Sequence, residues 1–132
     1  MDMAKKILES ARVIAVVGCS RDASKPSGYV PEYLASQGYR IIPINPFADS
    51  ILGIKALKSL AEAKGSFDTV DVFRPSGEAY KIAKEAFENG AKALWLQEGI
   101  TNADAEKYSL SCGMDFVQDR CMMKEHMKIF GR

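Results

Sequence analysis

Short apolar segments that recur between amphipathic ones constrain the fold of this chain more than any other feature. Residues 12–18 read RVIAVVG, an almost wholly apolar and largely β-branched run that ends in glycine. Such a run is typical of a strand buried on both faces of a sheet, because a half-exposed strand would alternate polar and apolar side chains. Further segments with strand character follow at 39–45, 69–73, 92–97 and 114–119.

Helical patterns fill the intervals between these strands. The clearest covers 77–90, where apolar residues recur at i, i+3, i+4 and i+7 and Gly90 ends the pattern. Other helices are expected at 30–38, with Pro31 in the first turn, at 102–113 and at 121–130, and 51–63 is expected to begin extended around Gly53 and then turn helical. Strands joined by helices at this spacing predict an α/β fold: one Rossmann-like, doubly wound domain over residues 1–132 with a mainly parallel five-stranded sheet.

Pro43 interrupts the expected strand at 39–45. Proline has no N–H and cannot donate to a strand ladder, so it is confined to edge strands and bulges. We therefore expect a bulge or one-sided pairing at this position.

The charge balance excludes several classes of partner. Eighteen basic and seventeen acidic residues leave a net charge of +1, which provides no broad footprint for nucleic acid or an anionic membrane. No apolar run approaches the ~18–20 residues that span a bilayer, and the N-terminal MDMAKKILESAR has the mixed charge of an amphipathic helix, not of a signal peptide. The three cysteines match neither a zinc pattern nor a paired disulfide framework, so a reducing, cytoplasmic location is expected.

The loop after the first strand suits an anion. Ligands of open parallel sheets bind beyond the carboxyl ends of the strands, and here Gly18 permits a close turn while Ser20 and Ser27 supply hydroxyl groups. The start of the next helix offers free N–H groups, and Lys25 adds a positive charge that Arg74 could complement from across the cleft. A phosphorylated ligand is the natural occupant, although an ordinary strand–helix connection with serine caps fits the same residues.

The residues at the end of the second strand distinguish between classes of nucleotide ligand. A typical NAD site carries Asp or Glu there to bind ribose hydroxyls, whereas this chain has Asn45 followed by Pro46. An NADP site usually has a nearby arginine, but Arg40 lies at the opposite end of the strand. Dinucleotide redox cofactors are therefore disfavoured, and a ribose that already carries a phosphate fits better.

No nucleophile, base and orienting group can be assembled from the sequence, so we assign no enzymatic activity. His126 is interpreted as a surface or helix-packing residue, and Tyr29 and Tyr33 as cover for the sheet, with shielding of a ligand as the alternative. Two other functions stay open: an NAD(P)-dependent or nucleotide-sugar enzyme, and a ligand-sensing module that regulates a protein partner. Two copies could also pair through the apolar surface of the terminal helix.

Several segments together resemble the family of small stand-alone CoA-binding domains. They are VVGCSRDASKPSGYVPEYLASQGYRIIPINP, GIKALKSL, VDVFRPS, ALWLQEGITN and DRCMMKEH. The same layout is similar to the CoA-binding N-terminal domain of the succinyl-CoA synthetase α subunit. The phosphorylated histidine and ATP-binding domain of that enzyme have no counterpart here, so the resemblance carries ligand binding and not ligase chemistry.

The resemblance implies coenzyme A or an acyl-CoA as the ligand, with its pyrophosphate at the first strand–helix loop. The binding residues it implies are Gly18, Cys19, Ser20, Lys25, Pro26, Ser27, Asn45, Pro46, Phe73, Arg74, Gln97 and Gly99. Asn45 and Pro46 would lie beside the ribose phosphate and adenine, and Gln97 and Gly99 would close the groove. If CoA binds there, Cys19 is a candidate for a mixed disulfide, because helix N–H groups and Lys25 would lower the pKa of its thiol.

Overall fold

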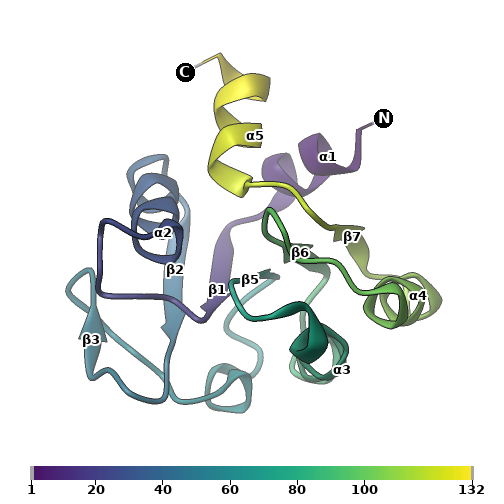
Figure 1. The fold of residues 1–132 in the computed structure, drawn as a ribbon, viewed down its shortest axis with the longest axis horizontal. Helices are drawn as coiled ribbons and strands as arrows, with labels where there is room; N and C mark the ends of the chain where they lie inside the picture. Colours follow the sequence, from purple (N-terminus) through teal and green to yellow (C-terminus); the bar gives the residue numbers. More distant parts are fainter. Residues whose placement is uncertain (1, 132) are drawn as a thin grey trace.

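Five parallel strands form the central sheet of the computed structural model, which describes residues 2–131. In spatial order they are β2 (Arg40–Ile44), β1 (Val13–Val17), β5 (Thr69–Val72), β6 (Ala93–Leu96) and β7 (Asp115–Val117) (Figure 1). The chain leaves β1 towards β2 on one side and then crosses to β5 on the other. A switch point therefore lies between β1 and β5, where a parallel sheet places its ligand cleft.

Helices cover both faces of this sheet, as the doubly wound prediction requires. On one face α1 (Met3–Ser10), α2 (Pro26–Ser36) and α5 (Met122–Phe130) share an apolar cluster with the sheet. The other face is covered by η1 (Leu60–Ala63), α3 (Ala79–Glu88) and α4 (Ala103–Ser111), and the short η2 (Ser76–Glu78) leads into α3. Alternation along β6 divides the core, because Trp95 packs on the first face and Leu94 and Leu96 on the second. No helix in residues 2–131 has the length and apolar character needed to cross a membrane.

Two local predictions differ from the structure. The first connecting helix begins at Pro26, four residues before the expected start at 30, because Lys25 is the extended N-cap and proline is favoured in the first turn. The segment 51–63 contains the hairpin β3 (Ser50–Ile51) and β4 (Ile54–Lys55), and only the four residues of η1 are helical. Leu52 and Gly53 both have positive φ, which is the turn geometry that joins two short antiparallel strands and ends any helix.

The pairing at Pro43 is one-sided, as expected, and needs no bulge. Strand β2 lies at the edge of the sheet and pairs with β1 in an unbroken register in which Val16 faces Pro43. The Pro43 carbonyl points away from β1, where it accepts a hydrogen bond from the Leu57 N–H at 2.9 Å. The ring nitrogen lies on the same outer side, so the missing N–H costs the β1–β2 ladder nothing.

Candidate functional site

The loop between β1 and α2 begins at a glycine that no other residue could replace without movement. Gly18 has φ of 86°, and a Cβ added there would lie 2.8 Å from the carbonyl oxygen of Phe73. The end of β1 is therefore in close contact with the end of β5. This contact brings the first loop and the Phe73–Arg74 segment to one cleft.

Hydrogen bonds within the loop hold it against the start of α2. The Asp22 carboxylate accepts from the Ser24 N–H at 2.9 Å and from its hydroxyl at 2.6 Å, and the Ser20 N–H donates to the Ser27 carbonyl at 2.9 Å. That carbonyl is free because its usual helical donor would be residue 31, which is proline. Gly28 completes the contact, since a Cβ there would lie 2.1 Å from the Asp22 carbonyl oxygen.

The start of α2 has no capping side chain, because Lys25 occupies the N-cap position and makes no side-chain cap hydrogen bond. Pro26 has no N–H and the Gly28 N–H donates to the Lys25 carbonyl at 2.8 Å, so the Ser27 N–H is the donor of the first turn that is open to a ligand. The Lys25 ammonium has no ion-pair or hydrogen-bond partner among residues 2–131. A helix start beside an unpaired cation is a favourable place for a phosphate group.

This loop forms one wall of a cavity of about 580 Å³, called here the large cavity. The lining residues come from the ends of β1, β2 and β5, from η1 and from α3: Val17, Gly18, Cys19, Ser20, Lys25, Ser27, Ile44, Asn45, Pro46, Phe47, Lys58, Ser59, Leu60, Phe73, Arg74, Glu78, Lys81, Ile82 and Glu85.

Four cations face two carboxylates in the large cavity. The cations are Lys25, Lys58, Arg74 and Lys81, and the acids are Glu78 and Glu85. The Arg74 guanidinium binds Glu78 through two hydrogen bonds of 3.2 and 2.8 Å, which lowers the pKa of Glu78. The excess of positive charge suits a ligand with more than one phosphate.

Asn45 closes the end of β2 onto the first loop. Its side-chain Nδ2 donates to the Cys19 carbonyl at 2.9 Å, and its Oδ1 accepts from the Phe47 N–H at 2.8 Å. The position where an NAD site carries a carboxylate is thus occupied by an amide with intramolecular partners.

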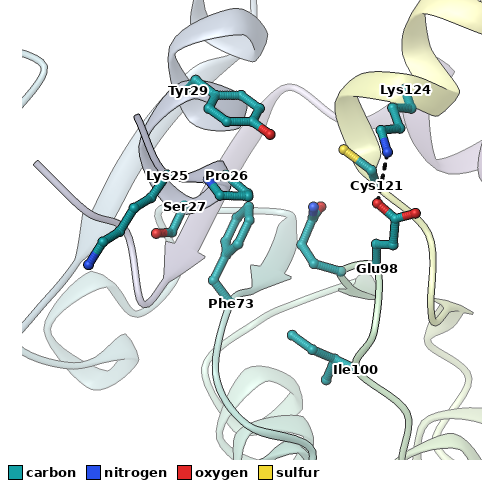
Figure 2. A pocket seen from close by; sticks show the side chains of 10 residues that line it. Lys25, Pro26, Ser27, Tyr29, Phe73, Glu98, Ile100, Cys121 and Lys124 are labelled. Atoms are coloured by element: carbon teal, nitrogen blue, oxygen red, sulfur yellow. Dashed lines mark hydrogen bonds and ion pairs between the residues drawn. The ribbon is translucent and has the colours of Figure 1, made fainter. Parts of the chain in front are cut away.

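A second cavity of about 330 Å³, called the small cavity, adjoins the large one (Figure 2). Its lining is Lys25, Pro26, Ser27, Tyr29, Phe73, Gln97, Glu98, Ile100, Cys121 and Lys124. Lys25, Ser27 and Phe73 line both cavities, so the two meet at the first loop and the Phe73 side chain. In Figure 2 the Lys25 amine points away from Tyr29 and Cys121, out of the small cavity.

Contacts between β6 and α5 form the far wall of the small cavity. The Gln97 side chain is 4% exposed, and its Oε1 accepts a hydrogen bond from the Met122 N–H at 3.1 Å. Lys124 and Glu98 form an ion pair of 3.0 Å across the rim. Gly99 lines neither cavity, and its N–H donates to the Asp119 carboxylate at 2.7 Å.

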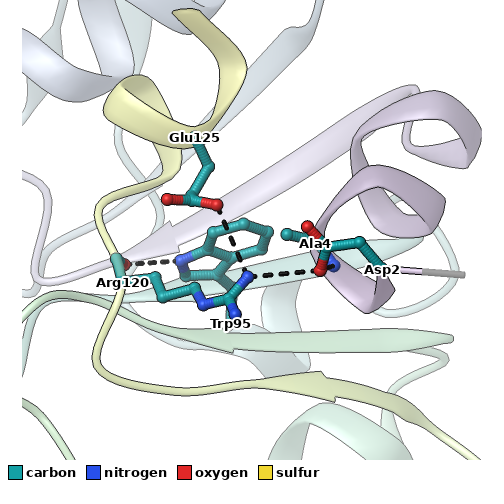
Figure 3. Close-up of polar contacts among 5 residues, drawn as sticks. All are labelled: Asp2, Ala4, Trp95, Arg120 and Glu125. Atoms are coloured by element: carbon teal, nitrogen blue, oxygen red, sulfur yellow. Dashed lines mark hydrogen bonds and ion pairs between the residues drawn. The ribbon is translucent and has the colours of Figure 1, made fainter. Parts of the chain in front are cut away.

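The segment that carries Cys121 is held by its neighbour Arg120 (Figure 3). The Arg120 carbonyl accepts from the buried Trp95 indole N–H at 2.7 Å. Its guanidinium contacts Asp2 at 3.2 Å and Glu125 at 3.4 Å, so it joins the starts of α1 and α5. Cys121 is therefore placed by fixed contacts at the entrance to α5.

The prediction of a low pKa for the Cys19 thiol is wrong. Cys19 is fully buried, and burial raises the pKa of its thiol to about 12, with a further contribution from Asp71. The thiol packs into the apolar cluster beneath α2 and does not benefit from the helix N–H groups or Lys25. Loss of solvation outweighs the favourable position of this residue in the sequence.

A buried carboxyl lies in the sheet behind this site. Asp71 is in β5, opposite Val16 and Trp95, and neither of its carboxyl oxygens has a hydrogen-bond partner. Burial raises the pKa of Asp71 well above its ordinary value, because the low-dielectric interior disfavours the charged carboxylate. The structure supplies no interaction that explains why an acid stands at this position.

His126 is a packing residue, one of the two interpretations that the sequence allowed. It is 6% exposed, its Nδ1 lies 2.7 Å from the Tyr33 hydroxyl oxygen, and it contacts the rings of Tyr39 and Phe130. It lines neither the large nor the small cavity, and it joins α5 to α2.

The structure gathers most of the predicted site residues at these two cavities. Those in the large cavity are Gly18, Cys19, Ser20, Lys25, Ser27, Asn45, Pro46, Phe73 and Arg74, and the small cavity adds Pro26 and Gln97. Gly99 is close in sequence but outside both. The sequence analysis did not include Lys58, Lys81 or Cys121 among the binding residues and interpreted Tyr29 as cover for the sheet. Lys58 and Lys81 lie away from the strand ends that were considered, whereas Cys121 follows the last strand and was not assigned to the site.

Comparisons with known proteins agree on one family. A model described as "CoA binding domain" matches residues 12–127. The chain is 38% identical over 122 residues to the protein YneT of Bacillus subtilis (strain 168), covering 92% of this chain and 90% of that protein. A solved structure from Thermus thermophilus has a TM-score of 0.91 at 38% identity and covers 98% of this chain and 100% of that one. An ADP-forming acetate–CoA ligase of Methanocaldococcus jannaschii is 28% identical over 91 residues, which are 69% of this chain and 13% of the ligase.

Proposed function

Because this chain belongs to the family of CoA-binding domains, we propose that it binds coenzyme A or an acyl-CoA across the two cavities, with the pyrophosphate at the β1–α2 loop. The observation that carries this placement is the unpaired ammonium of Lys25 beside the uncapped start of α2. A pyrophosphate supplies the negative charge that both groups lack.

The two cavities differ as the two halves of the ligand do. The phosphorylated nucleotide half needs cations, and the large cavity contributes Lys58 and Lys81 in addition to Lys25. The pantetheine arm is mostly apolar with amide groups, and the small cavity offers Phe73 and Ile100. The arm would cross from one cavity to the other beside Phe73.

The residues proposed to bind the ligand are those expected from the sequence, with two adjustments. Asn45 and Pro46 would lie beside the ribose and adenine as parts of the wall, since the Asn45 amide already has partners. Gly99 would act indirectly, through the turn that leads out of β6.

The proposal also covers the extent of the binding unit, its location and its partners. We take residues 1–132 as one cytoplasmic binding unit that acts without nucleic acid or membrane, alone, as a homodimer or with a protein partner. The three free cysteines agree with a reducing compartment.

Calorimetric titration with CoA, acetyl-CoA, NAD and NADP tests the proposal, after native mass spectrometry has shown that the protein is empty. We expect micromolar or tighter CoA binding and a loss of about tenfold or more in Lys25→Ala, because a charge-assisted phosphate contact is removed. Lys64→Ala, an exposed lysine outside both cavities, is the matched control. Absence of CoA binding by the empty protein would overturn the proposal, and binding of NAD or NADP instead would favour an oxidoreductase.

A further inference from the structure

The small cavity ends at a thiol. Cys121 is the N-cap residue of α5 and makes no side-chain cap hydrogen bond. It is 7% exposed, and Figure 2 shows its sulfur turned toward Tyr29 across the cavity. A molecule that reaches this sulfur must therefore enter through the small cavity.

The Gln97 side-chain amide lines the same cavity. Gln97 is 4% exposed. Its Oε1 accepts a hydrogen bond from the Met122 N–H, and this bond fixes the orientation of the amide. Its Nε2 has no acceptor among residues 2–131. Since Gln97 lines the cavity, this N–H is available to a ligand that carries a carbonyl group. The pantetheine arm has amide carbonyls and ends in a thiol.

The remaining cysteines are unsuited to the same chemistry. Cys19 lies at the phosphate end of the site, buried in the apolar cluster, and its thiol has a pKa of about 12. Cys112 packs on the opposite face of the sheet, beside the helices α3 and α4. Of the three cysteines, only Cys121 shares with Gln97 a cavity that is also lined by Lys25.

Fixed contacts surround Cys121. The next residue, Met122, donates its N–H to Gln97, and the Lys124 ammonium, which lines the same cavity, pairs with Glu98 at 3.0 Å. The Arg120 contacts with Trp95, Asp2 and Glu125 hold the backbone in place, so the sulfur need not be brought in by folding of a loop.

We propose that Cys121 is a site of reversible covalent attachment of CoA, formed by exchange with CoA disulfide; this rests on the proposed function. The Cys121 thiol gives its proton to solvent, and the thiolate attacks the disulfide sulfur nearer to it. A new sulfur–sulfur bond forms, the old one breaks, and the second CoA leaves as a thiolate that is protonated by solvent. The oxidant is the disulfide itself, and a small thiol reverses the step.

The test is intact-mass and peptide mapping of the full chain after incubation with CoA disulfide. We expect one CoA per chain, located on Cys121, removed by dithiothreitol and absent in Cys121→Ser. Cys112→Ser is the matched control and should react like the unchanged protein. Cys121→Ala provides a second variant, and urea unfolding of both Cys121 variants shows whether they fold.

A second reagent, glutathione disulfide, shows whether the reaction of Cys121 depends on CoA binding or only on the reactivity of an accessible thiol. Binding concentrates CoA disulfide at the site, so we expect it to react about tenfold faster than glutathione disulfide, and Lys25→Ala to slow only the CoA reaction. The inference would be overturned if the two disulfides reacted at equal rates that Lys25→Ala did not change, or if Cys19 or Cys112 were labelled instead. If reduced CoA binds but Cys121 stays unmodified, the inference fails and the proposed function stands. If reduced CoA does not bind, the proposed function fails first.

Discussion

The large and small cavities share Lys25, Ser27 and Phe73, yet they are built in different ways. The loop wall of the large cavity depends on close backbone contacts: Gly28 lets the loop touch α2, and Gly18 lets the end of β1 touch the end of β5. The small cavity depends on side chains that join distant segments, such as Gln97 to the start of α5 and Tyr33 to His126. The loop wall of the large cavity is therefore formed by backbone contacts around β1, whereas the small cavity exists only once α5 has docked.

The largest effect is expected at the backbone contact of the shared loop. In Gly28→Ala the new methyl group would lie 2.1 Å from the Asp22 carbonyl oxygen, so the loop must move away from α2. We expect a loss of about 3 kcal/mol or more in the free energy of unfolding, measured by urea denaturation, together with weaker CoA binding. Gly77→Ala, where the added Cβ meets open space, is the control and should be nearly neutral. A stable Gly28→Ala protein with unchanged affinity would show that the loop is not rigid.

The buried Asp71 in the central sheet should make the stability of the protein depend on pH. Burial holds the pKa of Asp71 above the value of about 3.8 that it has in the unfolded chain. Between these two values the unfolded state loses the proton while the folded state keeps it, so stability falls as pH rises through this window. We expect Asp71→Asn to remove this slope above about pH 4 and to stabilise the protein at pH 8 by roughly 1–3 kcal/mol.

Thermal unfolding between pH 4 and 8 measures this effect, with the exposed Asp49→Asn as control. If the wild-type protein and Asp71→Asn had the same pH profile, the raised pKa of Asp71 would be contradicted.

Weaker docking of α5 should impair ligand binding in the small cavity and leave binding in the large cavity unchanged. Tyr33→Phe removes the hydroxyl that meets His126 and should cost about 1 kcal/mol of stability. We expect weaker binding of CoA but unchanged binding of adenosine 3′,5′-bisphosphate, which lacks the pantetheine arm. Calorimetry with both ligands checks this, and Tyr80→Phe on α3 is the control. An equal loss for both ligands would mean that the cavities are not separable.

The smallest effect is expected from removing the charge of Glu78, the acid that pairs with Arg74. Glu78→Gln would free the guanidinium and remove a negative charge from the large cavity. CoA affinity should rise about twofold to fivefold at low salt and return to the wild-type value at high salt, as an exposed charge effect does. Glu106→Gln on α4 serves as the control. Weaker binding in Glu78→Gln would indicate that the Arg74–Glu78 pair positions the ligand.

The same contrast explains how far the sequence could predict the site. The strands and the first loop were predictable because a buried strand, a glycine and a lysine before a helix leave local patterns. Lys58 was missed because its segment has a helical pattern, whereas the positive φ of Leu52 and Gly53 makes a hairpin before it. Cys121 and Tyr29 meet only through the docking of α5 against α2, and no short pattern records a contact between segments so far apart.

The outer edge of β2 has a consequence for how copies of this protein can associate. Leu57 donates to the Pro43 carbonyl and accepts from the Asn45 N–H, so backbone groups that would otherwise face solvent are already paired. A strand from another molecule would find proline and occupied hydrogen bonds there, which is how natural sheets resist edge-to-edge polymerisation. Copies that join at this side of the molecule would therefore do so through helices and loops, and the sheet would keep its own five strands.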